Sequence, residues 1–293
     1  MILLDGPTKL NAKQIKLDSL FSVDRILASR GFRISKEGNA LSTILPKEYW
    51  TWQEANLIFS AFDNELTRSK LLNLTYDLSR ESCQTASELV GLDLVIDRNR
   101  FSTTFEWYVG ELLVRRFGAF SASFGVQVDQ MKRSEDGGNI GDFDVIAVMG
   151  DMNILYVECK TGGCSQQSIH QTIRRASQLH TVASVILLDK GVKELSLIQQ
   201  VSSRRHPRYA TGTPIPLMRI GIIDDSESFI YRWYNCFFIA GGKQTQLESR
   251  IRTVLRILAS DRVSWQEFSF SGGRRNFTDN GYSFESFESF ESI

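Results

Sequence analysis

The chain has 293 residues, a formal net charge of zero, a hydrophobic fraction of 42% and a charged fraction of 23%. These proportions are typical of a soluble globular protein with one large domain or two smaller ones. The balanced charge excludes a global basic field, so any contact with nucleic acid must come from a local basic patch.

The cysteines and the first residues bear on where the protein works. The four cysteines have no zinc-site spacing with one another or with the histidines, which favours free thiols in a reducing compartment. The opening MILLDGPTKL has too short an apolar run for a signal peptide, and no later segment is apolar enough to span a membrane. The sequence therefore predicts a cytoplasmic protein with no membrane partner.

Residues 1–95 are predicted to form a mainly helical accessory domain. Residues 10–29 and 49–92 have apolar spacing of three and four, and residues 30–46 are compatible with a hairpin that turns at 37–39. A helix followed by a hairpin is a loose winged-helix pattern, and a generic helical domain fits equally well.

Residues 96–265 contain the clearest alternation of helices and strands. The apolar patterns predict, in chain order, a helix over 105–118, strands over 121–131, 143–149 and 154–157, a helix over 165–180 and a strand over 183–189. The last strand–helix–strand unit should be parallel with a right-handed crossover. The expected class is therefore α/β.

The C-terminal part is predicted to extend this domain and then to end in a tail. A strand over 216–223 and a helix over 244–260 are expected. Residues 266–293 include three repeats of Phe-Glu-Ser, and such a low-complexity segment is expected to be disordered.

Charged residues lie at the ends of two apolar strands. Asp142 and Asp144 open the strand over 143–149, and Glu158 and Lys160 close the next one. Because side chains alternate along a strand, a tight hairpin between the two brings Asp144 and Glu158 together, with Lys160 close by. Two adjacent carboxylates suit Mg²⁺ or Mn²⁺, which also accept phosphate oxygens. A salt-bridged strand end without a metal ion is the alternative.

The pattern Asp144…Glu158-x-Lys160, between a helix that bears an acid and a second helix, resembles the PD-(D/E)xK nuclease superfamily. The segments FEWYVGELL, GDFDVIAV and LYVECKTG are similar to the nuclease domains of CRISPR-associated cyclic-oligonucleotide sensors, with Mrr-type restriction enzymes and archaeal Holliday-junction resolvases as more distant relatives. This resemblance implies a restriction-endonuclease-like αβββαβ core and a phosphodiesterase that requires Mg²⁺ or Mn²⁺.

The resemblance also implies which residues bind the metal ion. Asp144 and Glu158 would be ligands together with the backbone carbonyl of Cys159, and Lys160 would be the catalytic lysine. Glu106, on the first helix, would reach the metal ion through water.

Two further polar residues are expected near these groups. Asp142 would lie just outside the metal ligands. Gln171, with Gln167 as the second choice, would lie near the phosphate, and an exposed helix face is an equal alternative for both glutamines.

Arginines are expected to contact nucleic acid. They occur on the helix after Lys160 and in the loop SRRHPRY, where arginine lies beside an aromatic residue. Exposed solubilising charge is the alternative for the loop. The candidates are Arg174, Arg175, Arg204, Arg205 and Arg208.

These expectations describe a metal-dependent nuclease that cuts DNA in preference to RNA, with a role in defence against foreign nucleic acid implied by the resemblance alone. The alternative is a non-catalytic nuclease-like subunit that binds nucleic acid or a partner protein, and a winged-helix regulator ranks last. Residues 1–95 lack the strand–helix units of a nucleotide-sensing domain, which weighs against activation by a cyclic oligonucleotide. A homodimer or a partner protein stays open.

Overall fold

The structure is a computed structural model, and it describes residues 21–36, 38, 51–74, 79–94, 101–131, 139–150, 152–161, 164–189, 218–221, 229–233, 235–240 and 247–270. The chain divides into two compact units, Met1–Val254 and Leu255–Ile293, with the boundary inside the last helix, α9 (Leu247–Phe270). All strands of the sheet belong to the first unit.

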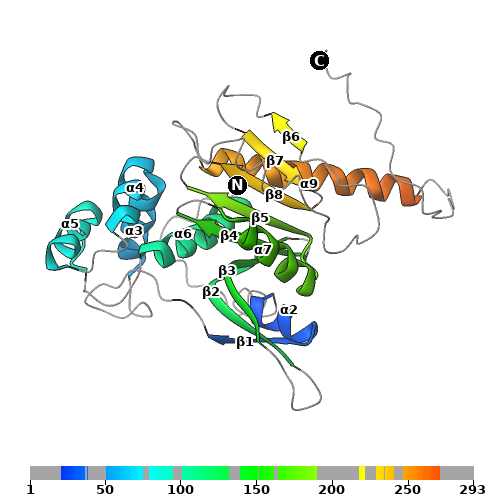
Figure 1. Cartoon of the computed structure of the whole chain (residues 1–293), viewed down its shortest axis with the longest axis horizontal. Coiled ribbons are helices and arrows are strands. Elements are labelled where there is room, and N and C mark those ends of the chain that lie inside the picture. Colours follow the sequence, from blue (N-terminus) through cyan, green and yellow to red (C-terminus); the bar gives the residue numbers. More distant parts are fainter. Residues whose placement is uncertain are drawn as a thin grey trace. The chain divides into compact units, whose positions relative to one another are not determined.

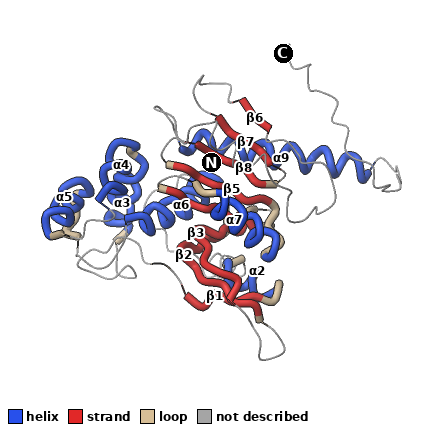
Figure 2. Tube along the Cα trace, in the orientation of Figure 1, coloured by secondary structure: helices blue, strands red, loops and turns tan. Residues whose placement is uncertain are grey.

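An eight-stranded mixed sheet is the frame of the first unit (Figure 1). β4 runs parallel to β5 and β5 runs parallel to β8, whereas the other neighbouring strands are antiparallel. Helices come before, between and after groups of strands along the chain (Figure 2), which confirms the α/β class. In sheet order the strands are β1 (Phe32–Lys36), β2 (Ser121–Gln130), β3 (Asn139–Val148), β4 (Ile154–Lys160), β5 (Ala183–Leu188), β8 (Cys236–Ala240), β7 (Phe229–Trp233) and β6 (Met218–Gly221).

The central elements follow one another in the expected order, with α6 (Phe101–Phe117) before β2, β3 and β4, and α7 (Gln166–Gln178) between the parallel strands β4 and β5. Ser165 caps α7: its hydroxyl accepts the N–H of Ser168 at 3.1 Å, and the Ser168 hydroxyl accepts the N–H of Ser165 at 3.1 Å. Such a reciprocal cap fixes where a helix starts. It sets the beginning of α7 a few residues after the end of β4.

Helix α6 packs against the sheet along its predicted apolar face. Phe105, Val109, Leu112 and Leu113 have no exposed surface, and each such side chain contributes roughly 1.5–3 kcal/mol by burial. Phe117, four residues after Leu113, is only half-buried. The backbone of α6 comes close to the sheet at Gly110, where a Cβ would lie 3.5 Å from the Cβ of Ala122.

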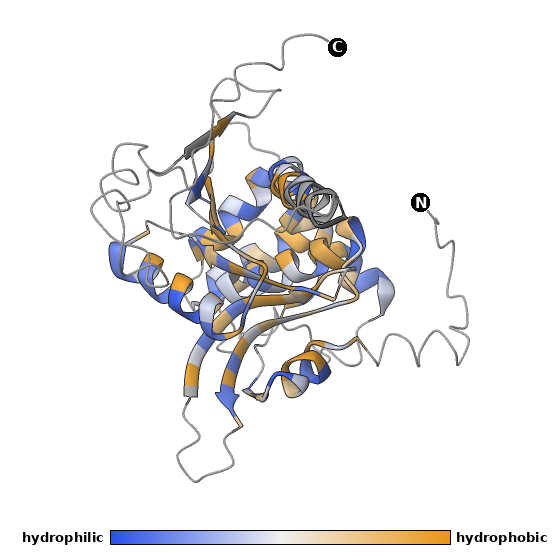
Figure 3. Ribbon diagram, turned by 90° about the vertical axis from the view of Figure 1, so that its right-hand side faces the viewer, coloured by the Kyte–Doolittle hydropathy of each residue, from blue (hydrophilic) through white to orange (hydrophobic). Residues whose placement is uncertain are grey.

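Apolar side chains also pack between α2 (Val23–Ser29), α7 and the strands. One cluster joins Val23 and Leu27 of α2 to Phe143, Tyr156 and the end of α7. A second cluster joins the first half of α7 to β5, β7 and β8. Figure 3 shows apolar residues concentrated on the central strands and on the helices beside them. The ends of β3 and β4 therefore rest on a tightly packed frame.

The segment before residue 95 contributes helices and also a strand. Its helices besides α2 are α3 (Trp52–Asp63), α4 (Glu65–Asn73) and α5 (Arg80–Val90), each with a side-chain N-cap. β1 pairs with β2, Phe32 opposite Gln130, and so forms an edge of the main sheet. The second strand of the hairpin expected there lies outside the described residues, and the domain boundary at residue 95 stays a prediction.

The C-terminal expectations are met in part where the structure describes the chain. β6 lies within the strand expected over 216–223, and α9 begins near the expected residue 244. The helix continues through residues 266–270, which were expected to begin the tail, and residues 271–293 lie outside the described ranges. Among the described residues, no helix combines the length and the apolar character needed to cross a membrane.

Candidate active site

Asp144 lies at the point where β3 separates from β4. The two strands pair from Val148 opposite Ile154 to Val145 opposite Val157, and the ladder ends there. The carboxylate of Asp144 then accepts the backbone N–H of Cys159 at 2.8 Å. A side chain thus takes the place of the next ladder hydrogen bond and holds this carboxylate against β4.

Two glycines accompany this separation of the strands. Gly125 of β2 lies between the residues that pair with Val145 and Phe143, and so faces Asp144 in the register. Its φ is +55°, and a Cβ there would lie 3.3 Å from the Oε2 atom of Glu106. Glu106 of α6 therefore reaches over the β2 backbone opposite Asp144. Gly141 of β3 also has a positive φ, +125°.

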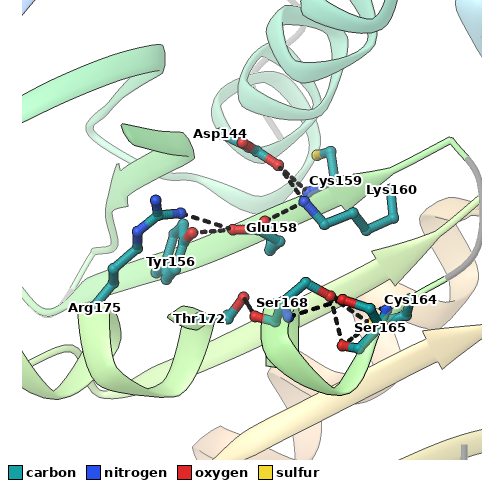
Figure 4. Close-up of polar contacts among 10 residues, drawn as sticks. All are labelled: Asp144, Tyr156, Glu158, Cys159, Lys160, Cys164, Ser165, Ser168, Thr172 and Arg175. Carbon is teal, nitrogen blue, oxygen red and sulfur yellow. Dashed lines mark hydrogen bonds and ion pairs between the residues drawn. The ribbon is translucent and has the colours of Figure 1, made fainter. Parts of the chain in front are cut away.

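Glu158 is buried in β4 with three partners around its carboxylate (Figure 4). It is 4% exposed, and it accepts hydrogen bonds from the hydroxyl of Tyr156 and from the ammonium of Lys160. Arg175 of α7 brings Nη1 to 3.9 Å from Oε2 of Glu158. Tyr156, Glu158 and Lys160 alternate along β4 and so share one face of the strand.

Lys160 joins the two carboxylates. Its Nζ lies 3.9 Å from Oδ2 of Asp144 and forms a shorter ion pair with Oε1 of Glu158. The lysine side chain is 26% exposed, whereas that of Glu158 is 5% exposed. The ammonium therefore lies between the two acids on the accessible side of the cluster.

Burial and mutual repulsion disfavour the ionised forms of the acids at this site. Burial, reinforced by the charge of Glu158, raises the pKa of Asp144 to about 7. Burial, followed by the charges of Asp144 and Glu158, raises the pKa of Glu106 to about 9. Burial lowers the pKa of Lys160, but the two carboxylates outweigh it and the pKa is raised overall. Asp144 and Glu106 therefore hold their protons to higher pH than ordinary carboxyl groups, and a divalent cation would favour their ionised forms.

The donor atoms fit a hard cation. Within a strand the N–H and C=O of one residue point to the same edge. Because the N–H of Cys159 points to Asp144, its carbonyl faces the same gap between β3 and β4. Two carboxylates and a carbonyl are oxygen ligands of the kind that Mg²⁺ and Mn²⁺ bind.

The side chains alone do not make a closed metal cage. Among the described residues, no group of three or more His, Cys, Asp or Glu side chains could hold a metal ion. A cation between Asp144 and Glu158 would therefore take its remaining oxygens from the backbone, from water or from a substrate. Mg²⁺ commonly keeps such an open shell in phosphate-processing sites.

The other predicted residues lie in different environments. Asp142 is exposed, opposite Gln127 in the β2–β3 ladder. Gln171, Gln167 and Arg174 are on the exposed side of α7, whose Thr172 and Ile173 are buried. Arg204, Arg205 and Arg208 lie outside the described residues.

Two residues have positions that the sequence reasoning did not assign. Tyr156 was taken only as part of an apolar strand, although its place two residues before Glu158 puts it on the same face. Arg175 was expected to face phosphates, and it contacts Glu158 and lies with its guanidinium carbon 5.8 Å from the ring centroid of Phe143. The contacts of Arg175 depend on how α7 packs against β3 and β4, so the sequence alone does not reveal them.

Comparisons with known proteins assign no family. No protein-family model matches the chain, and no match is found among the curated proteins. Among solved structures, protein VC1899 from Vibrio cholerae is 15% identical with a TM-score of 0.41, and the match covers 60% of this chain and 54% of that one. Can2 from Sulfobacillus thermosulfidooxidans, solved in complex with cyclic tetra-adenylate, is 12% identical with a TM-score of 0.36, and the match covers 61% of this chain and 55% of that one. The match thus spans about half the length of each of these two proteins, and TM-scores this low do not place the chain in a fold family.

Proposed function

We propose that the chain is a metal-dependent nuclease of the PD-(D/E)xK type, with a restriction-endonuclease-like core, that hydrolyses phosphodiester bonds. The observation that supports it is the convergence of Asp144, Glu158 and Lys160 where β3 leaves β4. The sequence pattern predicts these three residues, and in the structure Lys160 forms ion pairs with both Asp144 and Glu158. A strand end that only needed stabilising would not require a second carboxylate whose charge raises the pKa of Asp144.

The proposed roles follow from the geometry. Asp144, Glu158 and the carbonyl of Cys159 would hold Mg²⁺ or Mn²⁺. When bound, the ion supplies positive charge at the scissile phosphate and lowers the pKa of water beside it. Lys160 would hold the attacking water or donate to the phosphate oxygens as negative charge builds on them.

Neighbouring residues orient these groups. Tyr156 donates to one oxygen of Glu158, and Arg175 approaches the same oxygen, so the carboxylate cannot rotate freely. Glu106 reaches over Gly125 toward the same place and is suited to hold a water molecule between itself and the ion. Asp142 and Gln171, both exposed, would act only on a bound substrate.

The substrate is proposed to be DNA in preference to RNA, and the biological role to be defence against foreign nucleic acid. Arg174, exposed on α7 one residue before Arg175, supports contact with a phosphate backbone beside the site. Arg204, Arg205 and Arg208 are proposed to extend this contact.

The test is cleavage of single-stranded and double-stranded DNA and RNA with Mg²⁺, Mn²⁺ or EDTA. Cleavage by the wild type should require the metal ion and should disappear in Glu158→Ala/Lys160→Ala. The matched control is Glu111→Ala/Arg115→Ala, which removes the neighbouring Glu–Arg pair on α6 with Nε and Oε2 at 2.8 Å. Cleavage that persists in EDTA, or in the Glu158/Lys160 double variant, would contradict the mechanism.

The second candidate is a non-catalytic subunit that uses the same fold to bind nucleic acid or a partner protein. It is favoured by one observation: Lys160 already links both carboxylates, so the ion pairs satisfy each other without a metal ion. Calorimetric titration with Mg²⁺ and Mn²⁺ separates the two candidates. No heat of binding in the wild type, together with no cleavage of any substrate, favours the subunit.

A further inference from the structure

A buried ion pair connects the N-terminal helix α4 to the end of β5, the strand that pairs with the one carrying Lys160. Nε of Arg68, on α4, lies 3.0 Å from Oδ1 of Asp189, directly after β5, and the two side chains are 4% and 6% exposed. The partners are 121 positions apart in the chain. The proposed mechanism uses neither of them.

Asp189 is bonded to the backbone of Lys160. The N–H of Asp189 donates to the carbonyl oxygen of Lys160 at 2.9 Å, one step beyond the pair Lys160–Leu188 that ends the β4–β5 ladder. Asp189 is therefore held on one side by Arg68 and holds Lys160 on the other. A shift of the Asp189 backbone would shift the peptide from which the lysine side chain extends.

Arg68 is itself fixed from two other directions. Its Nη1 donates to the carbonyl of Phe62 at 2.8 Å, and its guanidinium carbon lies 5.9 Å from the ring centroid of Phe105. Phe62 belongs to α3 and Phe105 to α6, so one guanidinium joins three helices to the end of β5. A planar fork with several fixed donors can do this, whereas a lysine ammonium on a flexible stem cannot.

Stability alone does not explain a charged pair at this place. Apolar side chains of similar volume usually stabilise a buried contact at least as well as an ion pair does. Unlike an apolar contact, the ion pair is directional, because its hydrogen bonds hold the Asp189 side chain in one position. That placement matters at the one strand end where a catalytic lysine is proposed.

We infer that Arg68 and Asp189 are positioning residues for Lys160, and that the helices α3 and α4 act on the site through them. The inference deepens the proposed nuclease function and rests on it for its effect on catalysis. The contact between the ion pair and the Lys160 backbone does not depend on the activity, so it is measured separately.

The variant that tests the inference is Arg68→Met/Asp189→Leu, which removes both charges together and puts apolar side chains in their place. Removing one partner alone would leave a buried charge and could unfold the chain. The double variant should still fold, with a lower melting temperature because the buried carbonyl of Phe62 loses its donor. Its kcat should fall about 10- to 100-fold, because small displacements of catalytic groups have effects of this size. KM should change by less than about two-fold, since the substrate contacts are untouched.

The matched control is Arg33→Met/Asp129→Leu, which removes an ion pair between β1 and β2, at the far side of the sheet from β5, with Nη2 and Oδ2 at 3.6 Å. This control should leave both kcat and KM unchanged. A kcat of the test variant equal to that of the control overturns the positioning role.

Hydrogen exchange of the backbone amide at position 189, measured by NMR in the metal-free full chain, gives the second readout. This amide should exchange about ten-fold faster in the test variant than in the wild type, as expected for local opening, while the amide of Val185 in the middle of β5 keeps its rate. An unchanged rate at position 189 overturns the inference whether or not the wild type cleaves. The wild type could fail to cleave any substrate while the amide at position 189 still exchanges faster in the test variant. In that case the link to Lys160 is supported, and it is the nuclease function that fails.

Discussion

The carboxylate of Asp144 and the backbone N–H of Cys159 are joined by a hydrogen bond of 2.8 Å across the point where β3 leaves β4. A charged side chain thus completes the edge of the ladder, where a backbone carbonyl would otherwise accept. The same carboxylate lies 3.9 Å from Nζ of Lys160. One residue therefore contributes both to the shape of the sheet and to the charge of the site.

Asp144→Asn separates these two contributions, because the amide keeps an acceptor oxygen and loses the charge. We expect cleavage to fall by at least about 100-fold, the scale seen when a group that stabilises transition-state charge is removed. The metal-free variant should be more stable than the wild type at pH 8, since burial and Glu158 disfavour the ionised carboxylate. Asp93→Asn, an exposed aspartate, should change neither the rate nor the melting temperature. Wild-type cleavage by Asp144→Asn would rule out its role as a ligand.

Tyr156→Phe removes the hydroxyl that donates to the buried carboxylate of Glu158. The loss of a hydrogen bond to a charged group should lower the free energy of unfolding by about 1.5–3 kcal/mol. It should also lower kcat, since Glu158 is then held by one partner fewer. Urea denaturation and steady-state kinetics measure the two effects.

Tyr108→Phe is the matched control for that change. The hydroxyl of Tyr108 donates to the carboxylate of Asp63 at 2.6 Å, so its loss should cost a similar stability and leave kcat unaltered. Equal kcat values for the two variants would show that Tyr156 only stabilises the fold.

The order of the central elements was predictable because it depends on local patterns. The apolar face of α6 and the apolar runs of β3 and β4 are both set by residues close together in the chain. The pairing of β1 with β2, and of β8 with β5, was not predictable, because strands choose partners through contacts between distant segments. A short apolar run does not reveal which edge it joins.

The same distinction applies to the candidate site. Asp144, Glu158 and Lys160 could be placed together because strand alternation and one hairpin determine their faces. The contact of Arg175 with Glu158 depends on how α7 packs, and the pair of Arg68 with Asp189 joins segments 121 positions apart. No local pattern marks either one, and the roles proposed for these residues await the experiments.

The raised pKa values of Asp144 and Glu106 predict how the stability of the metal-free protein depends on pH. A carboxyl group whose folded-state pKa is raised keeps its proton longer in the folded state, so its stabilising effect is complete below the unfolded pKa and is lost as pH rises toward the folded one. With folded values of about 7 for Asp144 and about 9 for Glu106, the melting temperature in EDTA should fall steadily from pH 5 to pH 9.

Added Mg²⁺ or Mn²⁺ should reverse this loss at high pH, because the ion binds the deprotonated carboxylates. Glu106→Gln should reduce the slope in EDTA above pH 7, where Glu106 is the group still losing its proton. Thermal unfolding at five pH values, with and without the ion, checks both statements. A melting temperature that rises between pH 6 and pH 9 in EDTA would contradict the buried-acid description.

Gly125→Ala tests whether the β2 backbone opposite Asp144 needs a glycine. The φ of +55° costs an alanine about 1–2 kcal/mol, and its Cβ would also lie 2.8 Å from the Cα of Gly38 and 3.3 Å from Oε2 of Glu106. The clash with backbone should add roughly 1–3 kcal/mol. Gly118→Ala is the control, because its φ of +68° carries the same strain with nothing within 4 Å of the new Cβ. Urea denaturation should therefore show a larger loss for Gly125→Ala, and kcat should fall only in that variant because Glu106 is displaced. Equal losses of stability would mean that the approach of Gly38 and Glu106 to Gly125 does not constrain the site.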